Sequence, residues 1–415
     1  MKKIGLFLFD ICFALQMVAQ EQNYFTNPVI RGDVPDPSVI RIEDTYYATG
    51  TSSEWAPFYP MFTSKDLVNW KQVGHVFTKQ PSWTSNSFWA PELFYHNNKV
   101  YCYYTARQKS TGISYIGVAT SDSPLHEFTD HGPIVEYGKE AIDAFIYDDN
   151  GQLYISWKAY GLDTRPIELL GCKLSADGLH LDGEPFTLLV DEKGIGMEGQ
   201  YHFKEGDYYY IVYAAHGCCG PSSDYDVYVA RARNYGGPYE KYSGNPILHG
   251  GEGDYKSCGH GTVVRTSDGR MFYMCHAYLK GDGFFIGRQP ILQEMEMTDD
   301  HWVRFKTGNL AIAEQPIPFV GTKQEPLSDF EDNFKGNQLK VDWTWNYPYS
   351  DIHAVLKKGK LFLSGTPKNN NKYGTALCLR PQSPQYSCET KVINTGKGLK
   401  GLTLYGDDKN LIAWG

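Results

Sequence analysis

The sequence of 415 residues lacks several features that mark other classes of protein. After the first twenty residues, no stretch approaches the ~20 consecutive apolar residues that a membrane-spanning helix needs. The cysteines do not show the paired CxxC spacing that is typical of a structural zinc site. With 39 basic against 48 acidic residues, the chain also lacks the basic excess that nucleic-acid binding requires. These absences argue against a membrane span, a structural zinc ion and a nucleic-acid partner.

The first twenty residues form a segment of their own. Two lysines precede an apolar run over residues 4–14, and the small residue Ala19 stands before Gln20. This order of charged, apolar and small residues is typical of a secretory signal peptide. We therefore expect residues 1–20 to be removed and the mature protein to be secreted or periplasmic. Cys12 lacks the small residue that precedes a lipidated cysteine, which disfavours a lipoprotein anchor.

Eight cysteines follow this segment, and two of them, Cys218 and Cys219, are adjacent. Adjacent cysteines can close a vicinal disulfide in an oxidising compartment. Two ordinary buried thiols are the alternative, and the sequence leaves both open.

A short pattern recurs five times along the chain. Two turn-forming residues and a polar residue precede an apolar or aromatic residue and then Tyr or Phe, as in Asn150-Gly151-Gln152-Leu153-Tyr154. The aromatic anchors that close the copies stand at positions 47, 101, 154, 209 and 272, in steps of 54, 53, 55 and 63 residues. Repeats of this length, with several short strands and no long helical periodicity, are typical of β-propeller blades. The sequence therefore predicts an all-β fold with a five-bladed β-propeller.

A proline-rich stretch from Pro316 to Pro326 marks a boundary after the fifth repeat. We assign residues 24–322 to the propeller. Strand-like runs such as Leu361-Phe362-Leu363 follow and predict a second β domain, a β-sandwich, over residues 329–415. The last apolar run, residues 411–414, resembles the opening of a further strand, so we expect this domain to be truncated.

Three acidic residues stand at one distance before their anchors. Asp36, Asp143 and Glu198 each precede the anchor of their repeat by eleven residues, whereas Trp89 and His260 precede theirs by twelve. In a propeller this segment belongs to the innermost strand, and equivalent positions of different blades converge on the central channel. We therefore expect these five side chains to meet at one mouth of the channel.

Such a group of carboxylates suggests a chemistry. Neighbouring carboxylates repel one another and raise at least one pKa, so that one acid stays protonated beside an ionised one. Glycoside hydrolysis needs this pair, because an acid protonates the leaving oxygen while a base activates water. A single aspartate in a turn-rich protein usually caps a turn or faces solvent. Three acids in register within apolar surroundings are better explained by catalysis, since burial without a function is costly.

These segments resemble glycoside hydrolase family 43, the five-bladed inverting pentosidases, over residues 27–318. The motifs that carry the resemblance are Asp33-Val34-Pro35-Asp36-Pro37-Ser38, Ser64-Lys65-Asp66-Leu67-Val68-Asn69-Trp70, Phe88-Trp89-Ala90-Pro91-Glu92, Gly259-His260-Gly261 and Gly287-Arg288-Gln289-Pro290. The resemblance implies that Asp36 is the general base and Glu198 the general acid. It implies that Asp143 orients the acid and raises its pKa.

The resemblance also implies roles for four residues around the acids. His260 contacts the sugar or helps to hold a hydrated calcium ion on the propeller axis, although imidazole is not a preferred ligand of a hard cation. A core histidine with satisfied hydrogen bonds is the alternative. Arg288 contacts the sugar hydroxyls and the base carboxylate, or else forms a surface ion pair. Trp89 and Trp55 are candidate platforms for a sugar ring, and Trp55 is equally explained as a core or rim aromatic residue.

The sequence favours an inverting glycoside hydrolase that acts without an organic cofactor on a pentose-containing oligo- or polysaccharide. It would remove terminal β-D-xylosyl or α-L-arabinofuranosyl residues from xylan- or arabinoxylan-type glycans. An endo-arabinanase is one alternative, since it differs mainly in the loops that close the channel. A non-catalytic carbohydrate-binding propeller is the other. The presence of all three acids disfavours it, because a lectin needs no matched acid and base.

Overall fold

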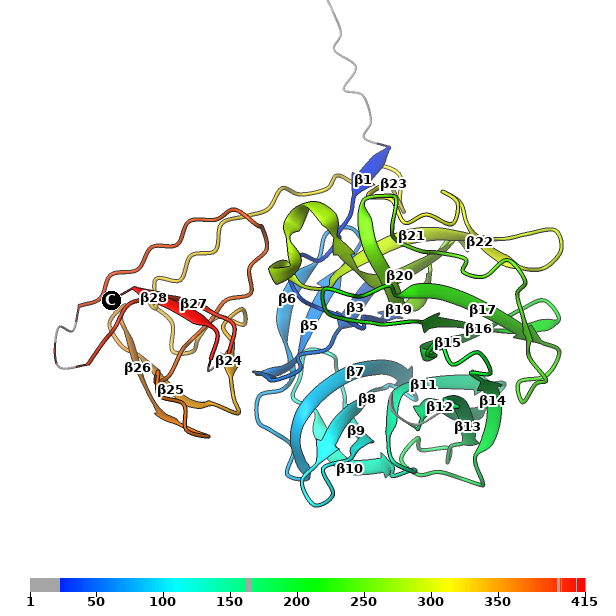
Figure 1. Cartoon of the computed structure of the whole chain (residues 1–415), viewed down its shortest axis with the longest axis horizontal. Helices are drawn as coiled ribbons and strands as arrows, with labels where there is room; N and C mark the ends of the chain where they lie inside the picture. The colour runs from blue at the N-terminus through cyan, green and yellow to red at the C-terminus, as the bar shows by residue number, and fades with distance from the viewer. Residues whose placement is uncertain (1–22, 161–165, 394–395, 397, 408, 415) are drawn as a thin grey trace, which may run out of the picture.

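The computed structural model describes residues 23–160, 166–393, 396, 398–407 and 409–414 (Figure 1). Their regular secondary structure is almost entirely β, with two single-turn 3-10 helices, η1 (Lys280–Asp282) and η2 (Phe284–Ile286). Within this part of the chain, neither helix has the length and apolar character needed to cross a bilayer. The signal peptide expected over residues 1–20 lies outside the described residues.

Five four-stranded antiparallel sheets are arranged around one axis, which confirms the five-bladed propeller (Figure 1). The first strand of each blade contacts the first strand of the next blade, so these five strands line the axis. The blades are, in order, β2 (Ser38–Ile42), β3 (Thr45–Thr49), β5 (Phe58–Ser64) and β6 (Lys71–Phe77); β7 (Thr84–His96), β8 (Lys99–Gln108), β9 (Ser114–Ser121) and β10 (Thr129–Val135); β11 (Ala141–Asp149), β12 (Gln152–Ala159), β13 (Glu168–Lys173) and β14 (Phe186–Val190); β15 (Glu198–Glu205), β16 (Tyr208–Ala215), β17 (Asp226–Ala232) and β18 (Glu240–Lys241); β19 (Tyr255–Arg265), β20 (Met271–Leu279), β21 (Gln289–Met297) and β22 (Val303–Phe305).

The repeated sequence pattern forms the tight turn between the first two strands of a blade. Gly151, Gly206 and Gly269 adopt φ of +93°, +57° and +85° in three of these turns. Such left-handed backbone costs glycine little, which explains the residue type. The anchors Tyr101, Tyr209 and Phe272 are 5%, 9% and 1% exposed, so in these three blades the aromatic ring after the turn packs into the core.

Each innermost strand also contains, or closely follows, a sharp bend. Asp36, Ala90, Asp143, Gly199 and His260 all adopt positive φ, between +41° and +61°. In blades 2 to 5 the pairing of the first two strands shifts register at this residue, as in a β-bulge. A residue other than glycine is strained in this conformation, and such strain persists only where the surrounding fold holds it. The bend therefore recurs as a structural element of the blade.

The position of the bend in blade 4 differs from the position that the residue count predicts for Glu198. We expected Glu198 to occupy the same position as Asp36 and Asp143, but the bend residue of blade 4 is Gly199. Glu198 precedes it as the first residue of β15. Counting failed because the distance from the bend to the aromatic anchor varies between blades from ten to twelve residues.

The N-terminal segment is fastened to the last blade. Strand β1 (Tyr24–Thr26) pairs antiparallel with β23 (Glu314–Pro316). Asn27 follows β1, and its side chain donates to the carbonyl of Leu292 at 2.9 Å and accepts the N–H of Leu292 at 2.8 Å. Asn27 is 1% exposed. One side-chain amide thus joins the N-terminal segment to the backbone of β21.

The residues after β23 form small additional sheets beside blade 1 (Figure 1). Strand β24 (Trp345–Asn346) pairs with β4 (Trp55–Ala56), which lies between β3 and β5. Two hairpins follow, β25 (Ser350–Leu356) with β26 (Leu361–Pro367), and β27 (Leu402–Tyr405) with β28 (Leu411–Trp414). The domain limits 24–322 and 329–415 remain predictions.

Replacing Asn27 by alanine should destabilise the propeller by about 2–3 kcal/mol, because two buried backbone groups of Leu292 lose their partners. Urea unfolding followed by tryptophan fluorescence measures this change. Asn234→Ala is the control, since Asn234 is exposed and a surface substitution should cost less than about 0.5 kcal/mol. Equal stabilities for the two variants would show that the hydrogen bonds from Asn27 to Leu292 do not stabilise the propeller.

Candidate active site

The three predicted carboxylates gather at the ends of the innermost strands, around His260. The Nδ1 atom of His260 lies 3.3 Å from Oδ1 of Asp36 and 3.8 Å from Oδ2 of Asp143. The same Oδ2 accepts the N–H of Gly199 at 3.2 Å, directly after Glu198. Blades 1, 3, 4 and 5 therefore meet at one site on the propeller axis.

Asp36 is held as a carboxylate by groups from blades 1 and 5. The hydroxyl of Thr51 donates to its Oδ2 at 2.6 Å, and the Nη1 atom of Arg288 lies 3.6 Å from its Oδ1. Burial raises the pKa of Asp36, but the charges of Arg288 and His260 hold this pKa well below its ordinary value. The backbone N–H of Asp36 donates to Nδ1 of His276 at 3.1 Å. Burial lowers the pKa of His276 to about 4, so this imidazole is neutral.

Glu198 is held by groups from blades 3 and 4. The Nζ atom of Lys158 lies 2.6 Å from its Oε2, and the hydroxyl of Tyr225 donates to its Oε1 at 2.9 Å. Burial raises the pKa of Glu198, but Lys158 and Tyr225 outweigh it and hold this pKa below the ordinary value. The side chain of Lys158 is only 1% exposed, so its charge acts with little screening by water.

Asp143 carries the raised pKa of the cluster. Burial raises the pKa of Asp143 to about 7, and the negative charges of Glu198 and Asp36 add to this effect against the opposing charge of His260. We expected Asp143 to raise the pKa of Glu198. In the free site the pKa of Glu198 is lowered overall, because Lys158 lies against Glu198 and stabilises that carboxylate directly. The proton retained near neutral pH belongs to the Asp143–Glu198 pair as a unit.

Sequence reasoning missed four residues of this cluster: Thr51, Lys158, Tyr225 and His276. Lys158 had a readable signal, since a lysine within the apolar strand Gln152–Ala159 is costly unless a buried acid pairs with it. Tyr225 lies in the loop between β16 and β17, where local sequence gives no indication of a contact with Glu198. Thr51 and His276 look like ordinary strand or loop residues.

The remaining predicted residues lie at different distances from the carboxylates. Arg288 reaches Asp36, as described, and its backbone N–H donates to Oδ1 of Asp33 at 2.7 Å. Trp89 is partly exposed at the bend of blade 2, where the N–H of the following residue donates to Oγ1 of Thr51 at 2.7 Å. The ring of Trp55 stands edge-on to a tyrosine of β27, with centroids 6.0 Å apart, at the junction with the C-terminal sheets. Sugar contact by either tryptophan remains a prediction.

The charge of His260 bears on the calcium ion that the resemblance implied. Although burial opposes it, Asp143 and Asp36 raise the pKa of His260 to about 9, so this imidazole is protonated near neutral pH. A protonated imidazole has no lone pair for a metal ion. The described part of the chain also brings together no group of three or more His, Cys, Asp or Glu that could hold one. His260 and the carboxylates around it therefore do not fit a calcium site.

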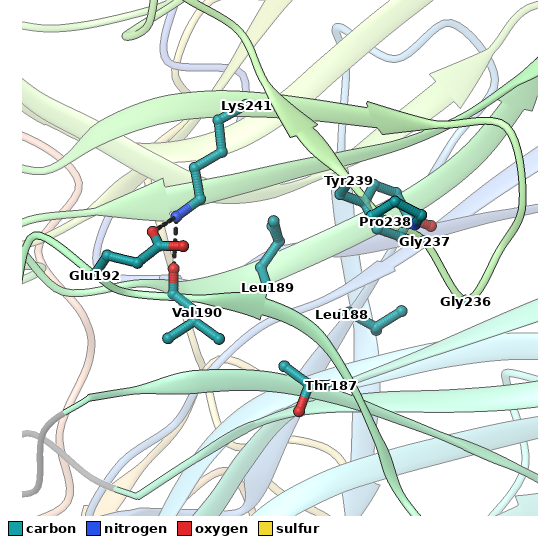
Figure 2. A pocket seen from close by; sticks show the side chains of 10 residues that line it. All are labelled: Thr187, Leu188, Leu189, Val190, Glu192, Gly236, Gly237, Pro238, Tyr239 and Lys241. Carbon is teal, nitrogen blue, oxygen red and sulfur yellow. Dashed lines mark hydrogen bonds and ion pairs between the residues drawn. The ribbon is translucent and has the colours of Figure 1, made fainter.

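A surface hollow of about 600 Å³ lies away from the axis, between β14 and the turn that leads to β18 (Figure 2). Its lining includes one carboxylate, Glu192, which pairs with Lys241 (Figure 2). Acid–base hydrolysis needs two carboxylates with different pKa values. This hollow therefore lacks the groups that the axial site has.

The axial site combines an ionised base with a retained proton. Asp36 is held as a carboxylate, while the Asp143–Glu198 pair keeps a proton up to about pH 7. An ionised carboxylate near a protonated one is the arrangement by which glycosidic bonds are hydrolysed. The fold and the site together define a propeller glycosidase.

The family model described as "Glycosyl hydrolases family 43" matches residues 25–303. The chain belongs to this family and is a glycosidase, which confirms the resemblance noted in the sequence. The match spans all five blades.

Two curated relatives align with most of the chain. A "Xylan 1,3-beta-xylosidase" of a Vibrio species is 28% identical, over 91% of this chain and 76% of the relative. The "Non-reducing end alpha-L-arabinofuranosidase BoGH43B" of Bacteroides ovatus is also 28% identical, over 98% of this chain and 77% of the relative. Among solved structures, the GH43 protein BlXynB of Bacillus licheniformis superposes with a TM-score of 0.71 at 24% identity, over 86% of this chain and 72% of that one, which supports the fold.

Replacing His260 by glutamine tests the charge pairing on the axis. The folded protein holds the proton of His260 up to about pH 9, whereas an unfolded histidine loses it near pH 6.5. The resulting stabilisation is complete below about pH 6.5 and is lost as the pH rises through about 9. Relative to His260→Gln, the free energy of unfolding of the wild type should therefore fall by about 2–3 kcal/mol between pH 6 and pH 9.5. Urea unfolding at several pH values measures it, and a constant difference would show that His260 is neutral in the fold.

Proposed function

We propose that the protein removes terminal β-D-xylosyl or α-L-arabinofuranosyl residues from xylan-type glycans, with inversion at the anomeric carbon. The observation that carries this proposal is the unequal protonation of Asp36 and the Asp143–Glu198 pair within one site. The substrate class is supported by the names of the xylosidase and the arabinofuranosidase reported above, each of which aligns with more than nine-tenths of the chain.

In this proposal Asp36 is the general base. A base must be ionised before it can take a proton from water, and Arg288, His260 and Thr51 stabilise the carboxylate form of Asp36. Asp36 is 8% exposed, so competing bulk water is largely excluded from this carboxylate. The attacking water loses its proton to Asp36 as its oxygen bonds to the anomeric carbon.

Glu198 is the general acid. It delivers the proton of the Asp143–Glu198 pair to the glycosidic oxygen as the bond to the anomeric carbon breaks. This step leaves Glu198 as a carboxylate, and the ammonium of Lys158 and the hydroxyl of Tyr225 lie in contact with that carboxylate. Both groups therefore stabilise the product of proton transfer, while Asp143, whose pKa is raised, retains the proton of the pair beforehand.

The supports of the two carboxylates favour an inverting reaction. Asp36 is held from blades 1 and 5, and Glu198 from blades 3 and 4, with no partner in common except the imidazolium of His260. An inverting pair must stand about 6.5–9.5 Å apart to leave room for water. Separate supports from different blades suit that requirement.

An endo-arabinanase and a non-catalytic binding propeller are less well supported. The pairing of β24 with β4 places C-terminal chain beside the loop of Trp55, on one side of the propeller, which favours a mouth closed on that side. A binding protein has no need for two carboxylates with opposite pKa shifts, since buried charges that serve no reaction only cost stability.

We also propose that the protein is exported. The signal-peptide pattern of residues 1–20 supports this proposal, as does the disulfide between Cys218 and Cys219, since disulfides form and persist in oxidising compartments.

The two carboxylate roles can be separated by the leaving group. Asp36→Asn should lower kcat/KM at least about 1,000-fold on both a dinitrophenyl pentoside and a natural disaccharide. Both reactions need the base that activates water, whatever the leaving group. Glu198→Gln should lose about 100-fold or more on the disaccharide but far less on the dinitrophenyl substrate, because a good leaving group needs no acid. Colorimetric and sugar-release assays give these ratios.

Two results would overturn these assignments. One is substantial activity of Asp36→Asn on either substrate. The other is an equal loss for Glu198→Gln on activated and unactivated substrates. Proton NMR of the first-formed sugar tests the stereochemistry, since a product with the anomeric configuration of the substrate contradicts inversion.

Lys158→Met should move the alkaline limb of the kcat/KM profile on a disaccharide to higher pH. The charge of Lys158 lowers the pKa of Glu198, so its loss keeps the acid protonated to higher pH, while kcat falls because the product carboxylate loses its partner. Lys65→Met is the control, because Lys65 pairs with Asp44 at the exposed surface. An alkaline limb that stays in place or moves to lower pH would contradict the role of Lys158.

A further inference from the structure

Two aromatic rings are presented to solvent beside the active site. Phe284 and Phe285 are 47% and 58% exposed in the turn formed by η1 and η2, between β20 and β21. The flanking residues of this turn are buried: Asp282 is 8% exposed and Ile286 is 1% exposed. The turn is thus anchored on both sides of the two exposed rings.

The turn is fixed rather than loosely attached. The side chain of Gln289 donates to Oδ2 of Asp282 at 2.9 Å. Gly287 adopts φ of +86°, and a Cβ atom at this position would lie 2.2 Å from Oδ1 of Asp33, so only glycine fits. The next residue is Arg288, whose guanidinium faces Asp36. The exposed rings therefore have a defined position relative to the proposed base.

The turn contacts the loop between β16 and β17. The ring of Phe284 stacks on Tyr278, with centroids 5.0 Å apart and planes at 23°. The hydroxyl of Tyr278 accepts the backbone N–H of Gly220 at 3.2 Å. The disulfide of Cys218 and Cys219 lies immediately before Gly220, and Cys219 is exposed. The phenyl rings and the disulfide sulfurs thus belong to one connected rim.

The loop between β16 and β17 shows that the rim lies on the Glu198 side of the active site. The loop ends at Tyr225, whose hydroxyl donates to Glu198. In the proposed reaction Glu198 protonates the leaving oxygen, so groups beside Glu198 face the leaving part of the glycan. The carboxylates themselves are nearly buried, whereas Phe284, Phe285 and Cys219 are exposed. The terminal sugar fills the axial site, and the next unit along the chain reaches the rim.

We propose that Phe284, Phe285 and the Cys218–Cys219 disulfide form the subsite for the sugar on the leaving-group side, and that this subsite takes a xylopyranose unit. This inference rests on the proposed function. A pyranose with equatorial hydroxyls presents flat C–H faces that pack on an aromatic ring and on polarisable sulfur. The rim would select glycans whose second unit is a pyranose over those whose second unit is a furanose.

The test compares substrates with and without a second sugar. Xylobiose fills the leaving-group subsite, whereas xylopyranosyl fluoride reacts at the axial site alone. Phe284→Ala and Phe285→Ala should each lower kcat/KM on xylobiose about tenfold more than on the fluoride, the size expected when one apolar face is removed. Phe284→Tyr should restore xylobiose hydrolysis, since it keeps the flat ring. Phe362→Ala is the matched control, because Phe362 is 53% exposed on β26.

A second variant tests the disulfide. Replacing both Cys218 and Cys219 by serine removes the sulfur bridge from the rim and should also lower xylobiose hydrolysis more than fluoride hydrolysis. Losses that are equal on the two substrates, in the phenylalanine variants and in the cysteine variant, would overturn the subsite. Wild-type protein that hydrolyses neither xylopyranosyl nor arabinofuranosyl fluoride would instead overturn the proposed function, so the two failures are distinguishable.

Discussion

The left-handed bend at the inner end of each blade is the constraint on which the site depends. It occurs at Asp36, Asp143 and His260, and each of these residues would adopt a lower-energy backbone in an ordinary strand. The propeller holds these bends because each lies between a packed hairpin and the neighbouring blades. Asp36 and Asp143 thereby both lie within 4 Å of Nδ1 of His260, although the three residues belong to separate blades. Any change that relaxes the bend in one blade also changes the electrostatics of the others.

The second determinant is the balance of charge within this small volume. Three carboxylates in a nearly buried site would repel one another strongly. Lys158, His260 and Arg288 offset this repulsion: Arg288 and His260 both lie against Asp36, His260 also faces Asp143, and Lys158 lies against Glu198. Their placement is asymmetric: Asp36 is stabilised as an anion, while Asp143 retains high proton affinity. Near neutral pH, an ionised carboxyl from blade 1 therefore lies in the same site as a carboxyl from blade 3 that has a raised pKa.

The loops that support the carboxylates also form the rim around them. The segment that ends in Tyr225 begins with the vicinal disulfide, and the segment that ends in Arg288 begins with the exposed phenylalanines. Each loop therefore joins a catalytic contact at one end to an exposed surface at the other. The proposed subsite is thus connected through the backbone of these two loops to the residues that contact Glu198 and Asp36.

The sequence by itself determined the five blades, because the turn-and-aromatic repeat is local and each copy needs only its own hairpin. It also indicated Asp36, Asp143 and Glu198, since turn capping or contact with solvent seldom places three acids at repeated positions in apolar segments. Only the tertiary structure decided that Gly199, not Glu198, occupies the bend, and that Lys158 and Tyr225 hold Glu198. Only the tertiary structure shows that the pKa of Asp143 is raised and that of Glu198 is lowered. Proton affinity depends on charges brought together from different blades, and no local pattern in the chain encodes those distances.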